Sequence, residues 1–202
     1  MTEKPILFSG PMVRAILAGT KTQTRRVVSP SLRGRSAALD SVLVGGLAGM
    51  PAALADATLA AAVRLCPYDA DRLWVRETWA MHHAWDTKPP GQAAQSKRLW
   101  YRADTAEHII DGRGRWRPSI YMPRWASRLT LPVESIRVER LQDITEADAI
   151  AEGVGELGRV TDARGAFVAL WESINGKRPG CSWADDPWVW VVSFPREVPR
   201  GE

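Results

Sequence analysis

Apolar residues near the start of the chain are spaced in a way that predicts a short strand, a helix and a second strand or turn within residues 5–28. The apolar positions between 12 and 17 fall on one helical face. Ser9-Gly10-Pro11 favours a helix start, because proline loses nothing in the first helical turn. Gly19 suits the left-handed residue that ends a helix. The polar segment from Thr20 is therefore expected to follow a helix and to lead into a strand.

The pattern becomes typical of β-structure after about the first third of the chain. Residues 72–77 and 99–102 predict strands separated by a loop of about twenty residues, and residues 128–140 predict a long strand that bends at Pro132. The run of β-branched and aromatic residues at 188–194 is typical of a buried strand. These strands do not alternate regularly with helices.

Two short helices are expected in the last third of the chain. Thr145 can cap the first, with Asp148 three residues on, and Gly153 ends it. The second has apolar residues at helical spacing from Phe167 to Ile174. Strands interrupted by a few short helices predict an α+β domain, built as a small barrel or a curled sheet.

Residues 29–66 differ from the rest because they are rich in Ala, Gly, Leu and Ser and contain no aromatic residue. Helical pieces are expected within 51–65, since alanine-rich sequence has a high helix propensity. We interpret residues 31–65 as an insertion within a single domain that spans residues 1–202, a length within the usual range for one domain.

The composition is that of an ordinary globular protein, which excludes a disordered or collagen-like chain. The 27 Lys and Arg residues against 23 Asp and Glu residues give a net charge of +4, which permits a polyanionic partner without requiring one. Two cysteines are too few for a disulfide framework or a four-sulfur zinc site. The start of the chain lacks the pattern of a signal peptide, and the uncharged stretch 41–55 is shorter than the ~20 residues that span a bilayer. We therefore expect a cytoplasmic protein with no membrane segment and no obligate protein partner.

The polar segment from Gly19 to Arg26 is the first candidate for chemistry. A glycine followed by hydroxyls and cations can bind an anion or activate a hydroxyl, although the segment lacks the second glycine of a phosphate-binding P-loop. Lys21 and Thr24 are three residues apart, so on a regular strand they would point to opposite faces, and their cooperation would require a turn or bulge. A solvated basic turn is the alternative.

Three acidic residues are candidate partners for this segment. Glu77 follows an apolar strand, whereas Asp148 and Glu152 lie four apart on one helical face, the usual arrangement of a solvated helix surface. Glu152 stands at the helix end, where the helix dipole disfavours a carboxylate, and this suggests another reason for its position.

Histidines and cysteines show no metal-ligand spacing, so we expect no metal or other cofactor. Eight of the ten tryptophans divide into two groups. Those in apolar patterns are expected in the core: Trp74, Trp171, Trp188 and Trp190. Those beside basic or loop residues could stack a nucleobase, with packing as the alternative: Trp79, Trp85, Trp116 and Trp125.

Several segments together resemble the ASCH domain family in its phage and prophage branch. They include Pro5-Ile6-Leu7-Phe8, the run from Ile16 to Arg26, the run from Asp71 to Trp79, Tyr101 to Asp104, Pro118 to Arg128 and Trp171 to Gly176. The resemblance covers nearly the whole chain outside residues 31–65. It implies a PUA-like β-barrel with flanking helices, a fold associated with RNA.

The resemblance also implies a reaction, because small ASCH proteins are amidohydrolases that deacylate N4-acetylcytidine with a lysine, a threonine and a distant glutamate. The motif places the lysine at Lys21 and the threonine at Thr24, and the helix-end segment places the glutamate at Glu152, with Asp148 and Glu77 as rivals. In this hypothesis Lys21 is the general base, Thr24 the nucleophile and Glu152 orients the lysine or shuttles a proton.

We expect four further residues to contact the substrate: Arg25, Arg26, Glu77 and Trp79. Two alternatives stay open. The same basic cleft could bind RNA or a modified nucleotide without reacting, with a strong salt dependence, or it could cleave RNA as a ribonuclease.

Overall fold

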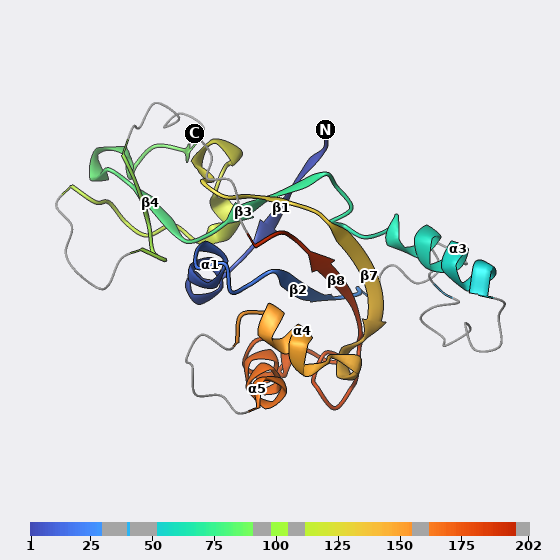
Figure 1. Ribbon diagram of the computed structural model, residues 1–202. Helices are drawn as coiled ribbons and strands as arrows, with labels where there is room; N and C mark the ends of the chain where they lie inside the picture. Colours follow the sequence, from blue (N-terminus) through green and yellow to red (C-terminus); the bar gives the residue numbers. More distant parts are fainter. Residues whose placement is uncertain (30–39, 41–51, 91–97, 105–111, 155–161, 197–202) are drawn as a thin grey trace. The chain divides into compact units, whose positions relative to one another are not determined.

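The computed structural model describes residues 1–29, 40, 52–90, 98–104, 112–154 and 162–196 (Figure 1). Contacts divide the chain into two compact units, each assembled from discontinuous segments. Unit 1 consists of Met1–Gly19, Ala70–Pro132 and Pro195–Glu202, and unit 2 consists of Thr20–Asp69 and Val133–Phe194. The sequence predicted one domain, and the structure adds the division into two compact units.

Unit 1 contains two small sheets and one α-helix among its described residues. Its three-stranded sheet has the order β1-β3-β6, formed by Glu3–Leu7, Arg72–Arg76 and Thr130–Pro132, with β1 parallel and β6 antiparallel to β3. Strands β4 (Trp79–Met81) and β5 (Leu99–Tyr101) pair antiparallel, and helix α1 spans Gly10–Leu17. Pro11 lies in the first turn of α1 and Gly19 adopts a positive φ of 70°, as predicted.

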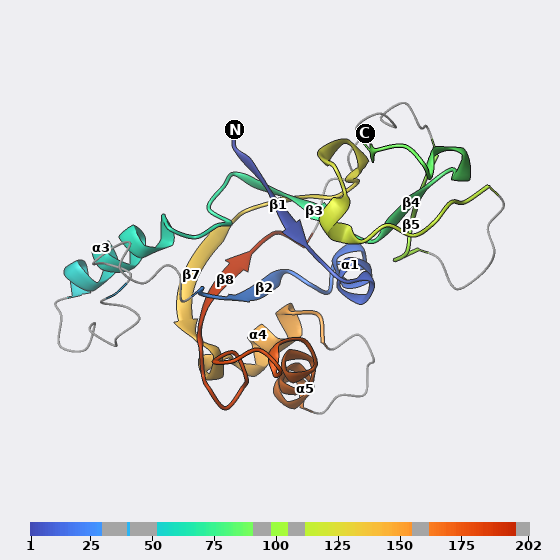
Figure 2. The same ribbon diagram turned by 180° about the vertical axis from the view of Figure 1, so that it is seen from behind.

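Unit 2 is built on an antiparallel sheet of order β2-β8-β7, with bounds Gln23–Val27, Trp188–Ser193 and Ser135–Arg140. Helices α4 (Glu146–Ala151) and α5 (Ala163–Asn175) lie together along this sheet in both views (Figures 1 and 2). Val189 and Val191 of β8 pack against Phe167 and Trp171 of α5. The alternate residue Trp190 packs with Ala62 of helix α3 (Ala52–Val63), so β8 contributes to a hydrophobic cluster on each face of the sheet.

Most predicted elements are present with small changes in their bounds. The predicted long strand at 128–140 is the main exception, because it consists of β6 in unit 1 and β7 in unit 2. The chain turns at the predicted bend after Pro132, and the Glu134 backbone N–H then donates to the Ser193 carbonyl. The predicted helix within 51–65 is α3. Of the predicted insertion at 31–65, residues 31–39 and 41–51 lie outside the described residues.

The fold is of the mixed α+β class, as the sequence predicted. The strand pairings of the described residues give open sheet orders and close no barrel. Within those same residues, we find no helix with the length and apolar character needed to cross a bilayer.

Candidate functional site

Lys21 and Glu152 meet where the chain enters β2. Lys21 forms an isolated antiparallel bridge with Glu152, and the Thr22 backbone N–H donates to the Ala151 carbonyl over 2.8 Å. Glu152 caps the C-terminal end of α4, and the next residue, Gly153, has a positive φ of 83°. The backbone therefore brings together two residues that are 131 positions apart in sequence.

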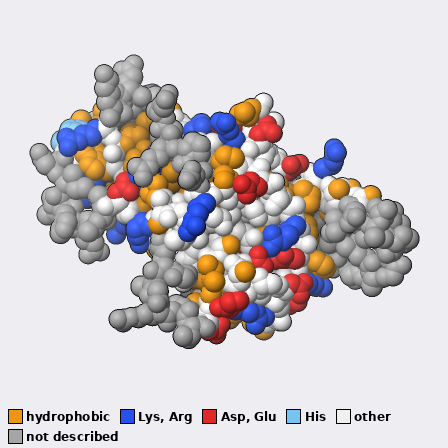
Figure 3. Space-filling view, viewed as in Figure 1, with side chains coloured by type: hydrophobic (Ala, Val, Ile, Leu, Met, Phe, Trp, Pro, Cys, Tyr) orange, Lys and Arg blue, Asp and Glu red, His pale blue; other side chains and the backbone are white. Residues whose placement is uncertain are grey.

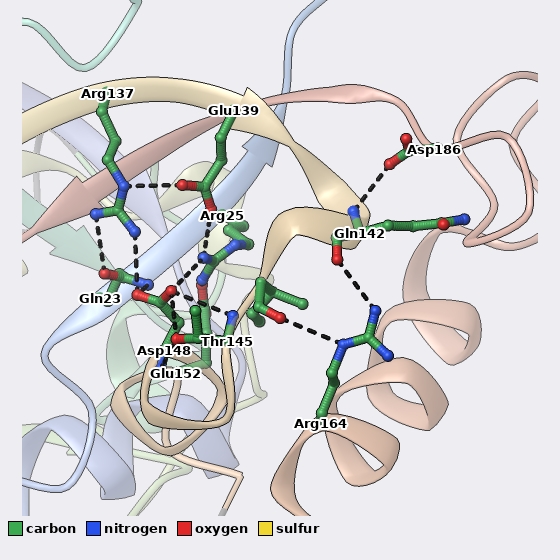
Figure 4. A network of polar contacts seen from close by, with 11 residues as sticks. Gln23, Arg25, Arg137, Glu139, Gln142, Thr145, Asp148, Glu152, Arg164 and Asp186 are labelled. Carbon is green, nitrogen blue, oxygen red and sulfur yellow. Dashed lines mark hydrogen bonds and ion pairs between the residues drawn. The ribbon is translucent and has the colours of Figure 1, made fainter.

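Helix α4 is held in place at its N-terminal end. The Thr145 side chain accepts a hydrogen bond from the Asp148 N–H, and the Asp148 carboxylate accepts one from the Thr145 N–H, which forms the predicted capping box. Arg164 of α5 donates to the carbonyls of Gln142 and Ile144 just before α4, at 3.0 and 3.3 Å (Figure 4). These contacts fix the position from which Glu152 reaches β2.

The Lys21 side chain is buried, with 1% of its surface exposed. Its Nζ donates to the Glu152 Oε2 over 2.8 Å and to the Glu152 backbone carbonyl over 2.9 Å. A charged amine in such a place requires hydrogen-bonded compensation, which Glu152 supplies through both its side chain and its backbone.

Arg25 connects this pair to two further carboxylates. Its Nη1 donates to the Glu152 Oε1 over 3.2 Å, while its Nη2 donates to Glu139 and lies 3.5 Å from the Asp148 Oδ2 (Figure 4). The guanidinium also lies over the Phe167 ring, 5.9 Å from its centroid. Arg25 thus connects β2 with β7, α4 and α5.

The outer side of the cluster is more exposed. Arg137, with 40% of its side chain exposed, donates to Glu139 over 2.8 Å and to Asp148 over 3.0 Å. Gln23 donates to the same Asp148 Oδ1 over 3.0 Å and accepts from Arg137. Three cations therefore face three carboxylates in unit 2: Lys21, Arg25 and Arg137 against Glu139, Asp148 and Glu152.

The surroundings shift two pKa values in this cluster. Burial lowers the pKa of the Lys21 amine below its usual value, and the neighbouring Glu152 carboxylate offsets this only in part. Partial burial would raise the pKa of Asp148, but hydrogen bonds from Thr145 and Gln23, with the charge of Arg25, lower the pKa to about 2. The lysine is therefore easier to deprotonate than an exposed one, while Asp148 stays ionised.

Thr24 and Arg26 lie on the other face of β2. The pairing of β2 with β8 runs without a break from Gln23↔Ser193 to Val27↔Val189, and the Phe194 N–H extends it to the Thr22 carbonyl. Thr24 therefore alternates with Arg25, and its buried hydroxyl is not hydrogen-bonded to Lys21 within the described part of the chain. The register contains no bulge that would turn the two side chains together.

Glu77 and Trp79, two predicted contact residues, belong to unit 1. Glu77 is buried and receives a two-pronged ion pair from Arg128, at 2.8 and 3.0 Å, and Arg128 also binds Asp104. Burial raises the pKa of Glu77, although Arg128 opposes this. Trp79 is wholly buried in a hydrophobic cluster of unit 1, with its ring perpendicular to that of Trp125.

Three members of the cluster were not predicted from the sequence: Gln23, Arg137 and Glu139. A signal was present in β7, because Arg137 and Glu139 alternate with Ile136 and Val138 along one strand. That alternation predicts a polar face, but only the contact between Arg137 and Asp148 in the folded chain shows that this face meets α4.

The cluster is suited to proton transfer, because a buried amine with a lowered pKa is hydrogen-bonded to a carboxylate. In the regions described by the structure, no group of three or more His, Cys, Asp or Glu residues is arranged to hold a metal ion. Comparisons of this chain with models of protein families, with curated proteins and with solved structures found no match.

Proposed function

We propose that the protein is an amidohydrolase that removes the acyl group from N4-acylated cytosine nucleosides, such as N4-acetylcytidine. The observation that carries this proposal is the Lys21 amine, buried and hydrogen-bonded to Glu152 over 2.8 Å. The proposal includes membership of the ASCH family and a PUA-like barrel, on the sequence resemblance alone.

In this mechanism the uncharged Lys21 amine takes the proton of the Thr24 hydroxyl, and the oxygen attacks the acyl carbon. Glu152 orients the amine and passes the proton that Lys21 has taken on to the exocyclic nitrogen of cytosine, which leaves as the free amine. Water then hydrolyses the acyl-threonine to a carboxylic acid and restores the hydroxyl. The burial that lowers the pKa of Lys21 supports the first step, because a general base must be unprotonated.

Thr24 lies on the face of β2 opposite to Arg25, so this mechanism requires a local change of conformation. The strand must rearrange near Thr22 when substrate binds, so that the hydroxyl reaches the amine. Thr24 is therefore the residue at which the proposal is tested most directly.

The experiment measures acetate release from N4-acetylcytidine by the full chain and by variants. Lys21→Met, Glu152→Gln and Thr24→Val are each expected to lower kcat/KM by at least about 100-fold, because each removes a proton-transfer group or the nucleophile. Thr24→Ser should keep a large part of the activity. Lys177→Ala, at an exposed lysine of unit 2, is the matched control and should leave kcat/KM unchanged.

Full activity in folded Lys21→Met would remove the general base from the proposal, and full activity in Thr24→Val would remove the nucleophile. The same preparations also test the two alternatives. Shortening of RNA without acetate release would identify a ribonuclease, and salt-sensitive binding of RNA without any product would identify a binding module.

A further inference from the structure

Unit 1 contains a pocket of about 550 Å³ that shares no residue with the Lys21 cluster. It is lined by Pro90, Arg115, Trp116, Arg117, Pro118 and Tyr121. Its volume lies within the range of ~300–1,000 Å³ that is usual for small-molecule sites. In Figure 3 hydrophobic and Lys or Arg side chains stand beside one another over the region of β4, part of the same unit.

Aromatic rings supply part of the pocket wall. Tyr121 ends the 3-10 helix Ser119–Tyr121, and 67% of its surface is exposed. Trp116 is half-buried, with the Arg113 guanidinium 4.4 Å and the Arg102 guanidinium 5.6 Å from its ring centroid. An exposed tyrosine next to a tryptophan that already lies against flat cations offers stacking surface for a planar ring.

The cations at the pocket include one that is held rigidly. The Arg117 side chain is only 10% exposed, and its Nη2 donates to the carbonyls of Trp85 and Asp86, at 3.2 and 3.3 Å. Its Nε is buried and has no hydrogen-bond partner among the described residues. Arg115 is exposed, and its backbone N–H binds the Asp86 carboxylate over 2.9 Å.

The charge around the pocket is strongly positive. Over the described stretches 82–90 and 112–121, the cations are Lys88, Arg113, Arg115 and Arg117, and the one acidic residue is Asp86. A largely buried arginine and an exposed one, beside two aromatic rings, match a ligand that has both a negative charge and a flat ring.

We propose that this pocket binds a nucleotide, with its base stacked on Tyr121 and its phosphate on Arg115 and Arg117. The nucleotide can be free or part of a single-stranded nucleic acid, since both offer the same chemistry. The site lies in a different unit from Lys21, so this inference goes beyond the proposed deacylation and does not depend on it.

The experiment measures binding of cytidine monophosphate, uridine monophosphate and a ten-nucleotide single-stranded RNA to the full chain by isothermal titration calorimetry. Arg115→Ala and Tyr121→Ala should each weaken nucleotide binding at least about tenfold, the effect expected for loss of a phosphate contact or a stacked base. Cytidine, which lacks the phosphate, should bind at least about tenfold more weakly than its monophosphate.

Three control variants make the result specific. Ile120→Ala alters a neighbouring exposed residue of the same 3-10 helix, and Arg72→Ala removes an exposed arginine of unit 1 away from the pocket lining. Both should bind nucleotide like the unaltered chain. Lys21→Met should also bind normally, so that loss of deacylation and loss of this site are separate results.

Comparison of the ligands identifies the source of the nucleotide. RNA binding that is much tighter than monophosphate binding and is lost in Arg115→Ala would assign the pocket to single-stranded nucleic acid, and equal affinities would assign it to free nucleotides. The proposal is overturned if no nucleotide binds, if the pocket variants bind as well as the controls, or if a polyglutamate peptide binds as tightly as the RNA.

Discussion

Two cations four positions apart in the sequence, Lys21 and Arg25, are buried together because they share the carboxylate of Glu152. Lys21 binds one oxygen of Glu152 and Arg25 binds the other. Arg25 has a side chain with 0% exposure and further carboxylate partners in Glu139 and Asp148. An isolated buried charge is costly, but a network in which every charge has a partner offsets most of that cost.

Replacement of Arg25 should therefore destabilise unit 2 strongly. Arg25→Met leaves the Glu139 and Glu152 carboxylates without their guanidinium, so we expect a loss of about 3–5 kcal/mol in the free energy of unfolding. Arg137→Met is the matched control, because Arg137 binds carboxylates of the same cluster from a side chain that is 40% exposed, and it should cost under about 1 kcal/mol. Urea unfolding measures both values, and equal losses would contradict a special role for the buried guanidinium.

Asp148 should make the stability of unit 2 sensitive to acid. Its pKa is about 2 in the folded chain and near 3.8 without the fold, so the ionised carboxylate contributes stability above about pH 4. That contribution is lost as the pH falls through about 2. Asp148→Asn should cost about 1 kcal/mol at pH 5, after solvent screening, and almost nothing below pH 2.

Urea unfolding between pH 5 and pH 2 measures this difference. Asp143→Asn, at an exposed aspartate just before α4, is the matched control for the same chemical change at a nearby position. A constant difference for Asp148→Asn across this range would show that the carboxylate is not stabilised by its hydrogen bonds.

At the scale of the element, the end of α4 depends on a single glycine. Gly153 follows Glu152 with a φ of 83°, a conformation that costs a residue with a side chain about 1–2 kcal/mol. Gly153→Ala should lower the free energy of unfolding by about 1 kcal/mol and reduce the proposed deacylation, because the Glu152 backbone must shift. Gly10→Ala, where an added Cβ meets only ordinary van der Waals contacts, should leave both measurements nearly unchanged.

The elements that the sequence predicted well are those determined by neighbouring residues. Thr145 and Asp148 lie within one helical turn of each other, so the capping box at the start of α4 could be recognised directly. The register of β2 could not, because it depends on pairing with β8, about 170 positions away. Local alternation already indicated opposite faces for Lys21 and Thr24 on a regular strand, and the unbroken register with β8 shows that β2 contains no bulge that would bring the two side chains together.

At the scale of the whole molecule, the predicted site residues belong to two units. Lys21, Thr24 and Glu152 lie in unit 2, whereas Glu77 and Trp79 lie in unit 1. The sequence prediction grouped all five residues in one site, because a pattern along the chain does not show which distant segments are in contact. The strand predicted at 128–140 shows the same limit, since a continuous β pattern crosses from one unit to the other.

Each unit has its own hydrophobic cluster, so we expect each to respond first to its own core substitutions. Val191→Ala in unit 2 and Val75→Ala in unit 1 remove side chains that are 0% and 1% exposed, and each should cost about 2 kcal/mol. Amide hydrogen exchange should show reduced protection mainly in the unit that holds the substitution. Equal loss of protection in both units for either variant would mean that the chain unfolds as one cooperative body.

The burial of Lys21 also makes this lysine a natural reporter of opening in unit 2. Acylating reagents modify uncharged amines that they can reach, and Lys88 and Lys177 are exposed whereas Lys21 is 1% exposed. The same burial that lowers the pKa of the Lys21 amine keeps reagents away from it, so Lys21 is expected to react only when unit 2 opens. Mass spectrometry after increasing times of acylation would therefore detect transient opening of unit 2 as slow modification of Lys21, after the exposed lysines have reacted.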